Sequence, residues 1–198
     1  FKGYRGYPAT LCTSINDVIV HGIPNDNVRL REGDLVSVDC GVLLDGFYGD
    51  SAVSFGVGDV GEEARRLMET TRLCLEDAVA VVGPDARLGD VGAAVQRRAE
   101  AAGFGVVREF VGHGIGRALH EEPQVPNYGK AGHGARLKPG LVIAIEPMIT
   151  VGSWRVSVDD DDWTARTEDG KLAAHFEWSV AVTADGHRVL GLEESMNA

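Results

Sequence analysis

Acidic residues interrupt segments of this chain that otherwise have the composition of buried β-strands. Asp is disfavoured in strands, and a charge on a half-buried sheet face is costly unless it is paired. Any one of these acids could form an ion pair with Arg or Lys. Four together are harder to explain in that way, because charges are rarely fully buried. The pattern predicts a sheet that brings four carboxylates to one site: Asp39, Asp50, Glu146 and Glu177.

The first two acids lie on a predicted β-hairpin. Apolar residues alternate with small or polar ones over 36–42, which is the period of a strand. Asp45-Gly46 then favours a two-residue turn. In that register Asp39 faces position 52, which makes Asp50 a diagonal neighbour on the same face, within about 7–8 Å. Two carboxylates at that distance repel each other unless a proton or a cation lies between them.

A histidine completes the set. His113 lies in the sequence Gly112-His-Gly-Ile-Gly116, and glycine lets the backbone approach a site closely. The motif is not a dinucleotide fingerprint, because its spacing differs and no helix follows. One imidazole and four carboxylates suit divalent ions such as Mn, Fe, Co or Zn. Four carboxylates are too many for one catalytic zinc ion, so we expect two ions.

The rest of the pattern predicts one α+β domain. Apolar residues recur at helical spacing over 62–82 and 88–102, and both runs end at glycine. We expect these helices to pack on the sheet without taking part in chemistry. Strands, then a helix pair, then more strands favour a largely antiparallel sheet with helices over one face. The later β-like segments are 106–111, 141–150 and 176–183.

Composition excludes several other classes of protein. A net charge of −11 argues against a nucleic-acid groove. No apolar run is long enough to span a bilayer. Three cysteines without framework spacing indicate reduced thiols in a cytoplasmic protein. We interpret the acidic run 159–162 as a solvated loop, and the first residue, Phe1, as a sign of a trimmed sequence.

Taken together, the motifs resemble those of the type I methionine aminopeptidases. Their order also matches, and the resemblance covers nearly the whole chain. The matching segments are His21-Gly-Ile-Pro24, Val38-Asp39, Gly46-Phe-Tyr-Gly-Asp50, Gly112-His-Gly-Ile-Gly116, His120-Glu-Glu-Pro123, Ile145-Glu-Pro-Met148 and Phe176-Glu177.

This resemblance implies the pita-bread fold, in which two pseudo-symmetric halves surround a dinuclear metal site. It also implies how the ligands divide between the two ions. Asp39 would chelate one ion, Asp50 and Glu177 would bridge the pair, and His113 and Glu146 would complete the second ion. These are the same five residues that the strand pattern selects.

The implied activity is hydrolytic removal of the N-terminal methionine from peptides and nascent proteins, through a water or hydroxide that bridges the two metals. Glu146 would shuttle the proton from that water to the leaving amine. His120 would support the developing oxyanion, and His21 would contact the substrate backbone near the leaving nitrogen. Binding of the substrate's free amino group to a metal would restrict cleavage to chain ends.

The resemblance also implies a pocket for the methionine side chain, lined by Tyr4, Tyr7, Cys12 and Trp163. Two positions depart from the family: Leu119 stands where phenylalanine is common, and Phe1 stands where cysteine is frequent. Three other histidines are assigned to structure or solvent: His133, His175 and His187. Of these, His175 could lie near the metal ligands, because it is adjacent in sequence to Glu177.

Family members carry a further N-terminal helix pair, so we expect residues 1–198 to be a single catalytic domain that lacks this segment. Such a chain should be less stable than the longer one, and equal unfolding midpoints would contradict this. The resemblance further implies a monomer that acts on peptide or nascent-chain ends in the cytoplasm. Ribosome contact is expected of the family, although no motif in the sequence marks it.

Two alternatives remain open at the level of sequence. A proline-directed peptidase of the same fold, such as prolidase or aminopeptidase P, would use the same five ligands. Those relatives carry a separate upstream domain and lack the early pattern from Tyr7-Pro8 to Pro24. A non-catalytic binding module on this scaffold is the second alternative. The complete ligand set and the acidic surface argue against it.

Overall fold

The structure, a computed structural model, describes residues 1–191, and within them two α-helices flank a set of antiparallel strands. In chain order the elements are η1 (Tyr4–Gly6), β1 (Cys12–Ile15), β2 (Val18–Val20), β3 (Leu35–Leu44), β4 (Phe47–Gly56), α1 (Glu62–Ala80), α2 (Leu88–Ala101), β5 (Gly105–Val106), β6 (Gly112–Gly114), β7 (Glu121–Val125), β8 (Val142–Ile145), β9 (Met148–Thr150), β10 (Val156–Val158), β11 (Ala165–Thr167), β12 (Ala173–His175), β13 (Glu177–Val182) and β14 (His187–Val189).

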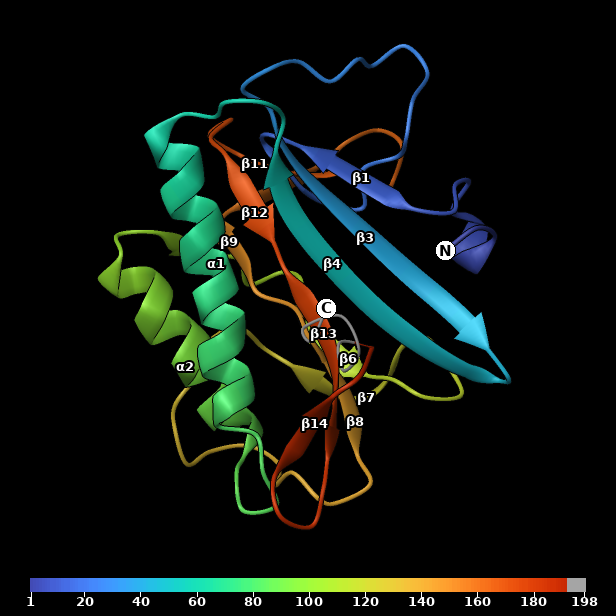
Figure 1. The fold of residues 1–198 in the computed structure, drawn as a ribbon, viewed down its shortest axis with the longest axis vertical. Coiled ribbons are helices and arrows are strands. Elements are labelled where there is room, and N and C mark those ends of the chain that lie inside the picture. The colour runs from blue at the N-terminus through green and yellow to red at the C-terminus, as the bar shows by residue number, and fades with distance from the viewer. Residues whose placement is uncertain (192–198) are drawn as a thin grey trace.

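The largest sheet follows the order β1-β3-β4-β13-β8-β6-β7, with β14 paired to β13. Every strand pairing in it is antiparallel, which confirms the expected sheet type. Two smaller sheets, β10-β11-β2 and β12-β9-β5, lie beside it. In Figure 1, β3 and β4 form a long hairpin that extends away from the helices.

The β3–β4 hairpin has the predicted register. Asp39 pairs with Ala52, and Leu44 pairs with Phe47 at the turn. Both turn residues have positive φ, 51° at Asp45 and 83° at Gly46. This is the backbone geometry that an Asp-Gly turn provides in two-residue hairpins. The turn residues therefore set the register, and the register sets which side chains share a face.

The two helices lie side by side against one face of the sheets (Figure 1). Helix α1 contacts β4, β8, β9, β12 and β13, and α2 packs on α1. The apolar stripe of α1 includes Leu67, Cys74 and Leu75, all fully buried in the main core. Asp90, in the first turn of α2, caps the start of this helix by accepting a hydrogen bond from the backbone N–H of Arg87 at 2.7 Å. Both helices serve as a support layer, as expected.

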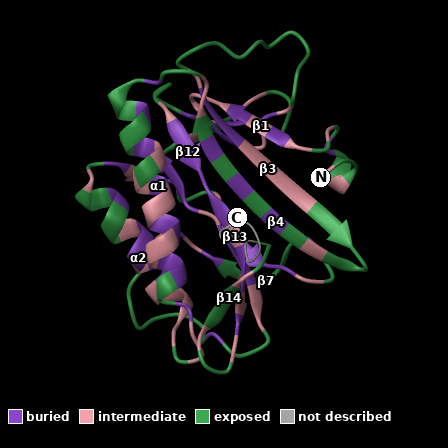
Figure 2. Ribbon diagram, in the orientation of Figure 1, coloured by how far each residue is buried: buried purple, intermediate pink, exposed green. Residues whose placement is uncertain are grey.

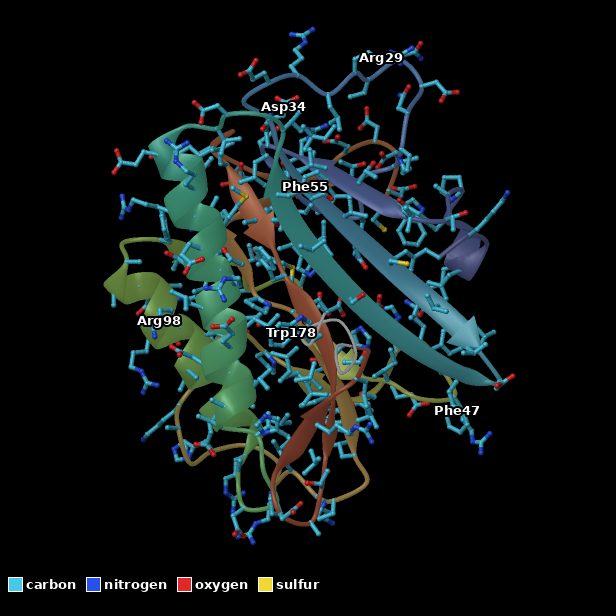
Figure 3. All side chains as sticks on the ribbon, in the orientation of Figure 1. Arg29, Asp34, Phe47, Phe55, Arg98 and Trp178 are labelled. Carbon is cyan, nitrogen blue, oxygen red and sulfur yellow. The ribbon has the colours of Figure 1, made fainter. Side chains whose placement is uncertain are left out.

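Side chains of β4 alternate strictly between the two faces, which Figure 2 shows as stripes. Asp50, Ala52 and Ser54 are buried, whereas Val53 and Phe55 are about half exposed on the opposite face. Phe55 and Phe47 are labelled near the two ends of this strand in Figure 3. The buried face is the one that carries the candidate site.

Two β-like segments are more broken than the sequence suggests. The predicted strand 106–111 is paired only as far as Val106, because the chain then crosses to β6 in another sheet. The predicted strand 141–150 breaks between Ile145 and Met148. Pro147, which has no N–H for a sheet ladder, lies in this break. Within residues 1–191, no helix has the length and apolarity needed to cross a membrane.

Candidate metal centre

Three neighbouring strands place two of the predicted acids in one row. Asp39 on β3 pairs with Ala52 on β4, and Ala52 pairs on its other side with Glu177 on β13. Partners that lie directly opposite in a sheet point to the same face. The small side chain of Ala52 therefore separates two carboxylates without filling the space above them. Glu177 is only 2% exposed.

Asp50 lies on the same face of β4, two residues before Ala52, and its backbone is held from β13. The Ser179 hydroxyl accepts the N–H of Asp50 at 3.0 Å and donates to its carbonyl at 2.9 Å. A side chain thus replaces the main-chain pairing at the point where the two strands separate. One ligand atom each from Asp50, His113 and Glu177 lies within 4.8 Å of the others.

His113 enters this group from β6, and its two flanking glycines are required by their neighbours. A Cβ on Gly112 would lie 2.3 Å from the carbonyl oxygen of Ala144, and one on Gly114 would lie 2.3 Å from that of Glu122. His113 Nδ1 lies 2.9 Å from the Gly114 carbonyl oxygen, which can only accept. Nδ1 therefore carries the proton, and Nε2 presents its lone pair.

Glu146 lies in the break between β8 and β9, outside the regular ladder. Its carbonyl accepts a hydrogen bond from Asn127 Nδ2 at 2.9 Å. Its carboxylate oxygen Oε1 lies 3.6 Å from His113 Nε2. The break frees this carboxylate from the strand alternation and lets it reach the same space as the other acids.

Burial raises the pKa values of all four carboxyls, and repulsion from neighbouring acids raises three of them further. Burial raises the pKa of Asp50 to about 6. Burial, and next the charge of Asp50, raise the pKa of Asp39 well above its usual range. Burial is also the main cause for Glu146 and Glu177, whose pKa values are raised further by the charges of neighbouring acids. Without a bound metal, it is therefore unfavourable for all four carboxyls to be ionised at the same time.

The donor set fits divalent cations. Oδ1 of Asp39 and Oδ1 of Asp50 are buried and have no hydrogen-bond partner among the described residues. Native structures rarely leave such atoms unsatisfied. A cation would satisfy both oxygens and offset the repulsion among the four carboxylates. The arrangement therefore fits a metal centre, and its chemistry would be that of a Lewis acid.

A cavity of about 320 Å³ opens above these acids. Most of the residues predicted for the site line it, together with Phe1, Arg5, Glu109, Phe110 and Val111, whereas His113 is not among the lining residues. Leu119, expected in the specificity pocket, instead lines a neighbouring pocket together with Phe1 and Tyr4. The predicted residues that line the cavity are Tyr4, Tyr7, Cys12, His21, Asp39, Asp50, His120, Glu146, Trp163 and Glu177.

Aromatic rings form one wall of the cavity. The rings of Tyr7 and Trp163 meet edge to face with centroids 5.1 Å apart. His21 contacts Phe110 in the same way at 5.3 Å. Tyr7 is fixed by its hydroxyl, which donates to the carbonyl of Gly22 at 2.9 Å. Such a wall is apolar and rigid, and suits an unbranched hydrophobic side chain.

Two histidines face the cavity from loops. His21 follows β2 with φ of 60°, a left-handed conformation that histidine adopts more readily than most residues. Burial lowers its pKa, so its ring is neutral. His120 Nδ1 lies 2.7 Å from the Tyr4 hydroxyl, and its ring centroid lies 4.1 Å from that of His113. Partial burial and the charge of His113 lower the pKa of His120 to about 4.

Sequence reasoning missed several residues that line or support this site. Asn127, Ser54, Ser179 and Phe110 have ordinary roles in isolation, and only their tertiary contacts connect them to the site. Phe110 had one available signal, since it comes shortly before the glycine-flanked His113. For His175 the sequence favours a structural or solvent role but allows a place near the metal ligands. Its ring does lie beside one of them, Glu146, with Nε2 3.7 Å from Oε2. Burial lowers the pKa of His175 to about 3.

Comparison with known proteins places this geometry in a family. The model of metallopeptidase family M24 matches residues 2–184. "Methionine aminopeptidase A" of Synechocystis is 50% identical over 192 residues, which are 97% of this chain and 76% of that protein. The crystal structure of methionine aminopeptidase from Thermotoga maritima has a TM-score of 0.94 and 48% identity, and the match covers 96% of this chain and 76% of that one.

A more distant structure shares the architecture alone. The prolidase from Pyrococcus horikoshii has a TM-score of 0.71 at 22% identity, and the match covers 92% of this chain and 47% of that one. The common fold is the pita-bread arrangement of a curled antiparallel sheet with helices on its outside. This chain belongs to metallopeptidase family M24 and, within it, to the methionine aminopeptidases.

Proposed function

We propose that this chain is a dinuclear metallopeptidase that removes the N-terminal methionine from peptides and nascent proteins. One observation carries the proposal: four carboxyls and an imidazole, drawn from separate elements, surround the floor of a cavity with an aromatic wall. Asp50, Glu177 and His113 are buried, and Asp39 and Glu146 are half-buried. The membership in the methionine aminopeptidases supports the choice of substrate. The proposal treats residues 1–198 as one catalytic domain.

Five residues would hold the two ions: Asp39, Asp50, His113, Glu146 and Glu177. Oxygen-rich ligation with one nitrogen suits Co, Mn, Fe or Zn, and the donor set does not choose among them. When bound, such ions lower the pKa of a water molecule and polarise the scissile carbonyl. His113 is already in the tautomer that offers Nε2, because its Nδ1 proton is used by Gly114.

Glu146 is the proposed proton shuttle. Glu146 lines the cavity, and its carboxylate lies beside the imidazoles of His113 and His175. A carboxylate at this position can accept a proton in one step and give it up in the next. It would take that proton from the attacking water and pass it to the leaving amine.

His120 and His21 would act on the substrate backbone. If the Tyr4 hydroxyl donates to His120 Nδ1, then the proton of the neutral ring lies on Nε2. That N–H could donate to the oxyanion that develops on the scissile carbonyl. His21 lines the same cavity from the opposite loop and would contact the peptide near the leaving nitrogen.

The methionine side chain would occupy the part of the cavity lined by Tyr4, Tyr7, Cys12 and Trp163. Leu119 would act on this pocket from the adjoining space behind Tyr4. Burial raises the pKa of the Cys12 thiol to about 12, which makes it an inert apolar contact at neutral pH.

The proposed setting is the cytoplasm, where a monomer would act on chain ends, including those that emerge from the ribosome. Three free cysteines without a disulfide among the described residues agree with a reducing compartment. The acidic net charge agrees with a peptide substrate rather than a nucleic acid.

The test is metal analysis combined with peptide hydrolysis. Protein loaded with Mn(II) or Co(II) should cleave Met-Ala-Ser and release methionine, and Xaa-Pro peptides should be poor substrates. Asp39→Asn should lose both metal and activity. Preferential cleavage of Xaa-Pro would favour the proline-directed alternative. Absence of metal binding would favour a binding module, and full activity without metal would exclude the mechanism.

A further inference from the structure

His175 is a buried imidazole that the five-ligand account leaves without a role. It ends β12 and is 1% exposed. Its Nε2 has no hydrogen-bond partner among the described residues. It does not line the cavity in which substrate would bind. A buried nitrogen of this kind is costly to keep unless it acts on a neighbour.

The backbone of His175 is fixed by serines from the hairpin. The Ser54 hydroxyl accepts the N–H of His175 at 2.9 Å and donates to its carbonyl at 2.8 Å. Ser37 on β3 lies 2.7 Å from Ser54, oxygen to oxygen. Since the Ser54 proton is used by His175, Ser37 donates the proton of that third bond. The position of the imidazole is therefore tied to β3 and β4, the strands that carry Asp39 and Asp50.

The Glu146 carboxylate lies between two imidazoles that come from different strands. Oε1 lies 3.6 Å from His113 Nε2, and Oε2 lies 3.7 Å from His175 Nε2. His113 has its proton on Nδ1, so its Nε2 cannot donate to Glu146 in the neutral ring. His175 Nε2 is the remaining nitrogen beside this carboxylate that can donate.

Glu146 needs such a donor more than the other acids do. It lies outside the strand ladder, and its main-chain carbonyl accepts a hydrogen bond from Asn127. Nothing in that bond sets the rotation of the carboxylate. A ligand to a metal must be held in one orientation, usually by a partner that does not itself touch the ion.

We propose that His175 is a positioning residue for the metal centre: its Nε2–H donates to Oε2 of Glu146 and directs Oε1 toward the side of His113. The inference rests on the proposed function. The present 3.7 Å separation is longer than a hydrogen bond, so the proposed bond requires the carboxylate to turn toward His175, to a separation of about 3 Å. His175 thereby sets the affinity for the ion that Glu146 binds, without touching that ion or the substrate.

Calorimetric titration of the metal-free protein with Mn(II) tests this, using three variants at position 175. His175→Leu keeps the approximate volume but removes the donor, and we expect it to weaken the binding of one ion by about 10–100-fold. His175→Gln places an amide N–H near the position of Nε2. Its metal affinity should therefore stay within about threefold of wild type, a smaller loss than in His175→Leu. His175→Asn carries the same donor on a side chain too short to reach Glu146, so it should bind the metal more weakly than His175→Gln does.

The other ion should bind to all three variants as it does to wild type. His187→Gln is the matched control, because it removes an imidazole that bonds the Val82 carbonyl, far from the site in sequence. It should leave both affinities unchanged. Circular dichroism establishes that each variant is folded, and the comparison of Gln with Asn stands even where Leu does not fold.

Two further measurements separate positioning from direct ligation. In the Co(II)-loaded protein, the visible absorption bands of His175→Gln should match those of wild type, because no ligand is lost. With Met-Ala-Ser, His175→Leu should lower kcat and leave KM nearly unchanged, since His175 does not contact the cavity.

Several results would overturn the inference. They are unchanged Mn(II) affinity in His175→Leu, equal losses in the Gln and Asn variants, and altered Co(II) bands in His175→Gln. Failure of the wild-type protein itself to bind metal is a different result, which would overturn the proposed function before position 175 is considered.

Discussion

At the scale of single residues, the site is held in a state that is unfavourable without a cation. Asp39 and Asp50 each bury an oxygen with no hydrogen-bond partner among the described residues. Two serines fix the backbones of Asp50 and His175 so that these side chains cannot relax away. This is preorganisation: the fold bears the cost of gathering like charges, and the bound ions offset it.

Replacing one of these acids should therefore have opposite effects on stability and metal affinity. Asp50→Asn removes one charge and supplies an amide that can donate to the buried oxygen of Asp39. We expect the metal-free protein to gain roughly 1 kcal/mol at pH 8, the worth of a typical hydrogen bond. Metal affinity and activity should fall at least about 100-fold, because a proposed bridging ligand is lost.

Thermal unfolding in chelator and calorimetric titration measure the two effects. Asp45→Asn, in the exposed hairpin turn, is the matched control and should change neither. An Asp50→Asn variant that is less stable than wild type in chelator would contradict the idea that repulsion dominates the metal-free site.

The raised carboxyl pKa values predict how pH affects the metal-free protein. The folded-state pKa of Asp50 is about 6, against about 3.9 in an unfolded chain. Between these values the native state binds more protons than the unfolded state, so stability falls as pH rises. Burial raises the pKa of the other three acids as well, so the stability of the metal-free protein should continue to fall toward neutral pH.

In chelator, the melting temperature should therefore be higher at pH 5 than at pH 8. The shift of Asp50 corresponds to roughly 3 kcal/mol in full, at about 1.4 kcal/mol for each unit of pKa. About half of this, roughly 1.4 kcal/mol, is lost between pH 5 and pH 8. Saturating Mn(II) should remove or reverse this trend, because ions bind the deprotonated acids. A metal-free protein that becomes more stable between pH 5 and pH 8 would count against the description of the site.

At the scale of elements, the alternation of β4 decides which residues can take part in chemistry. Ala52 lies between Asp39 and Glu177 in the cross-strand row. Ala52→Val should insert two methyl groups between these carboxylates. We expect overpacking to lower the free energy of unfolding by about 1–3 kcal/mol. The affinity for metal should clearly decrease as well.

Its neighbour on the opposite face provides the control. Val53 is 50% exposed, so Val53→Thr should change stability by less than about 0.5 kcal/mol and leave metal binding intact. Urea denaturation and metal titration of both variants check the pair. If both variants lost similar amounts of stability and metal affinity, the metal site would not depend on which face of β4 a residue lies on.

The sequence predicts the hairpin well because its signals are local. Alternation and an Asp-Gly turn determine the register, and that register brings Asp39 and Asp50 together. The helices are equally local, since their apolar stripes and terminal glycines lie within single segments. The break at Glu146 is harder to predict, because the apolar composition of 141–150 masks the effect of Pro147.

The supporting residues could not be predicted for a different reason. Ser54, Ser179 and Asn127 are polar residues of common types, and their partners lie 121, 129 and 19 positions away in sequence. No periodicity encodes such pairs. His175 had a weak signal in its closeness to Glu177, but only the fold shows that its ring faces Glu146.

At the scale of the whole molecule, the candidate centre connects the two ends of the described chain. Its acids come from β3, β4, β13 and the segment after β8, and His113 comes from β6. Bound ions would therefore cross-link strands that are joined otherwise by hydrogen bonds and packing. Anything that binds the native state alone stabilises it by mass action.

Chelation should thus destabilise the entire fold and not only a loop. At a free metal concentration 100 times the dissociation constant, bound metal contributes about 2.7 kcal/mol. For a chain of this size that corresponds to a shift in melting temperature of roughly 5–10 °C. Calorimetric scans with Mn(II) and with chelator measure it at neutral pH. Identical melting temperatures would show that the ions do not stabilise this fold.

The most direct test of the whole account is the location of the metals. Crystals grown with Co(II) and measured at its absorption edge should show two anomalous peaks in the cavity floor, both within reach of the Asp50 and Glu177 carboxylates. Asp39 should lie against one peak, and His113 and Glu146 against the other. A cavity without anomalous peaks, or peaks only at other surfaces, would contradict the assignment of these five residues as a dinuclear centre.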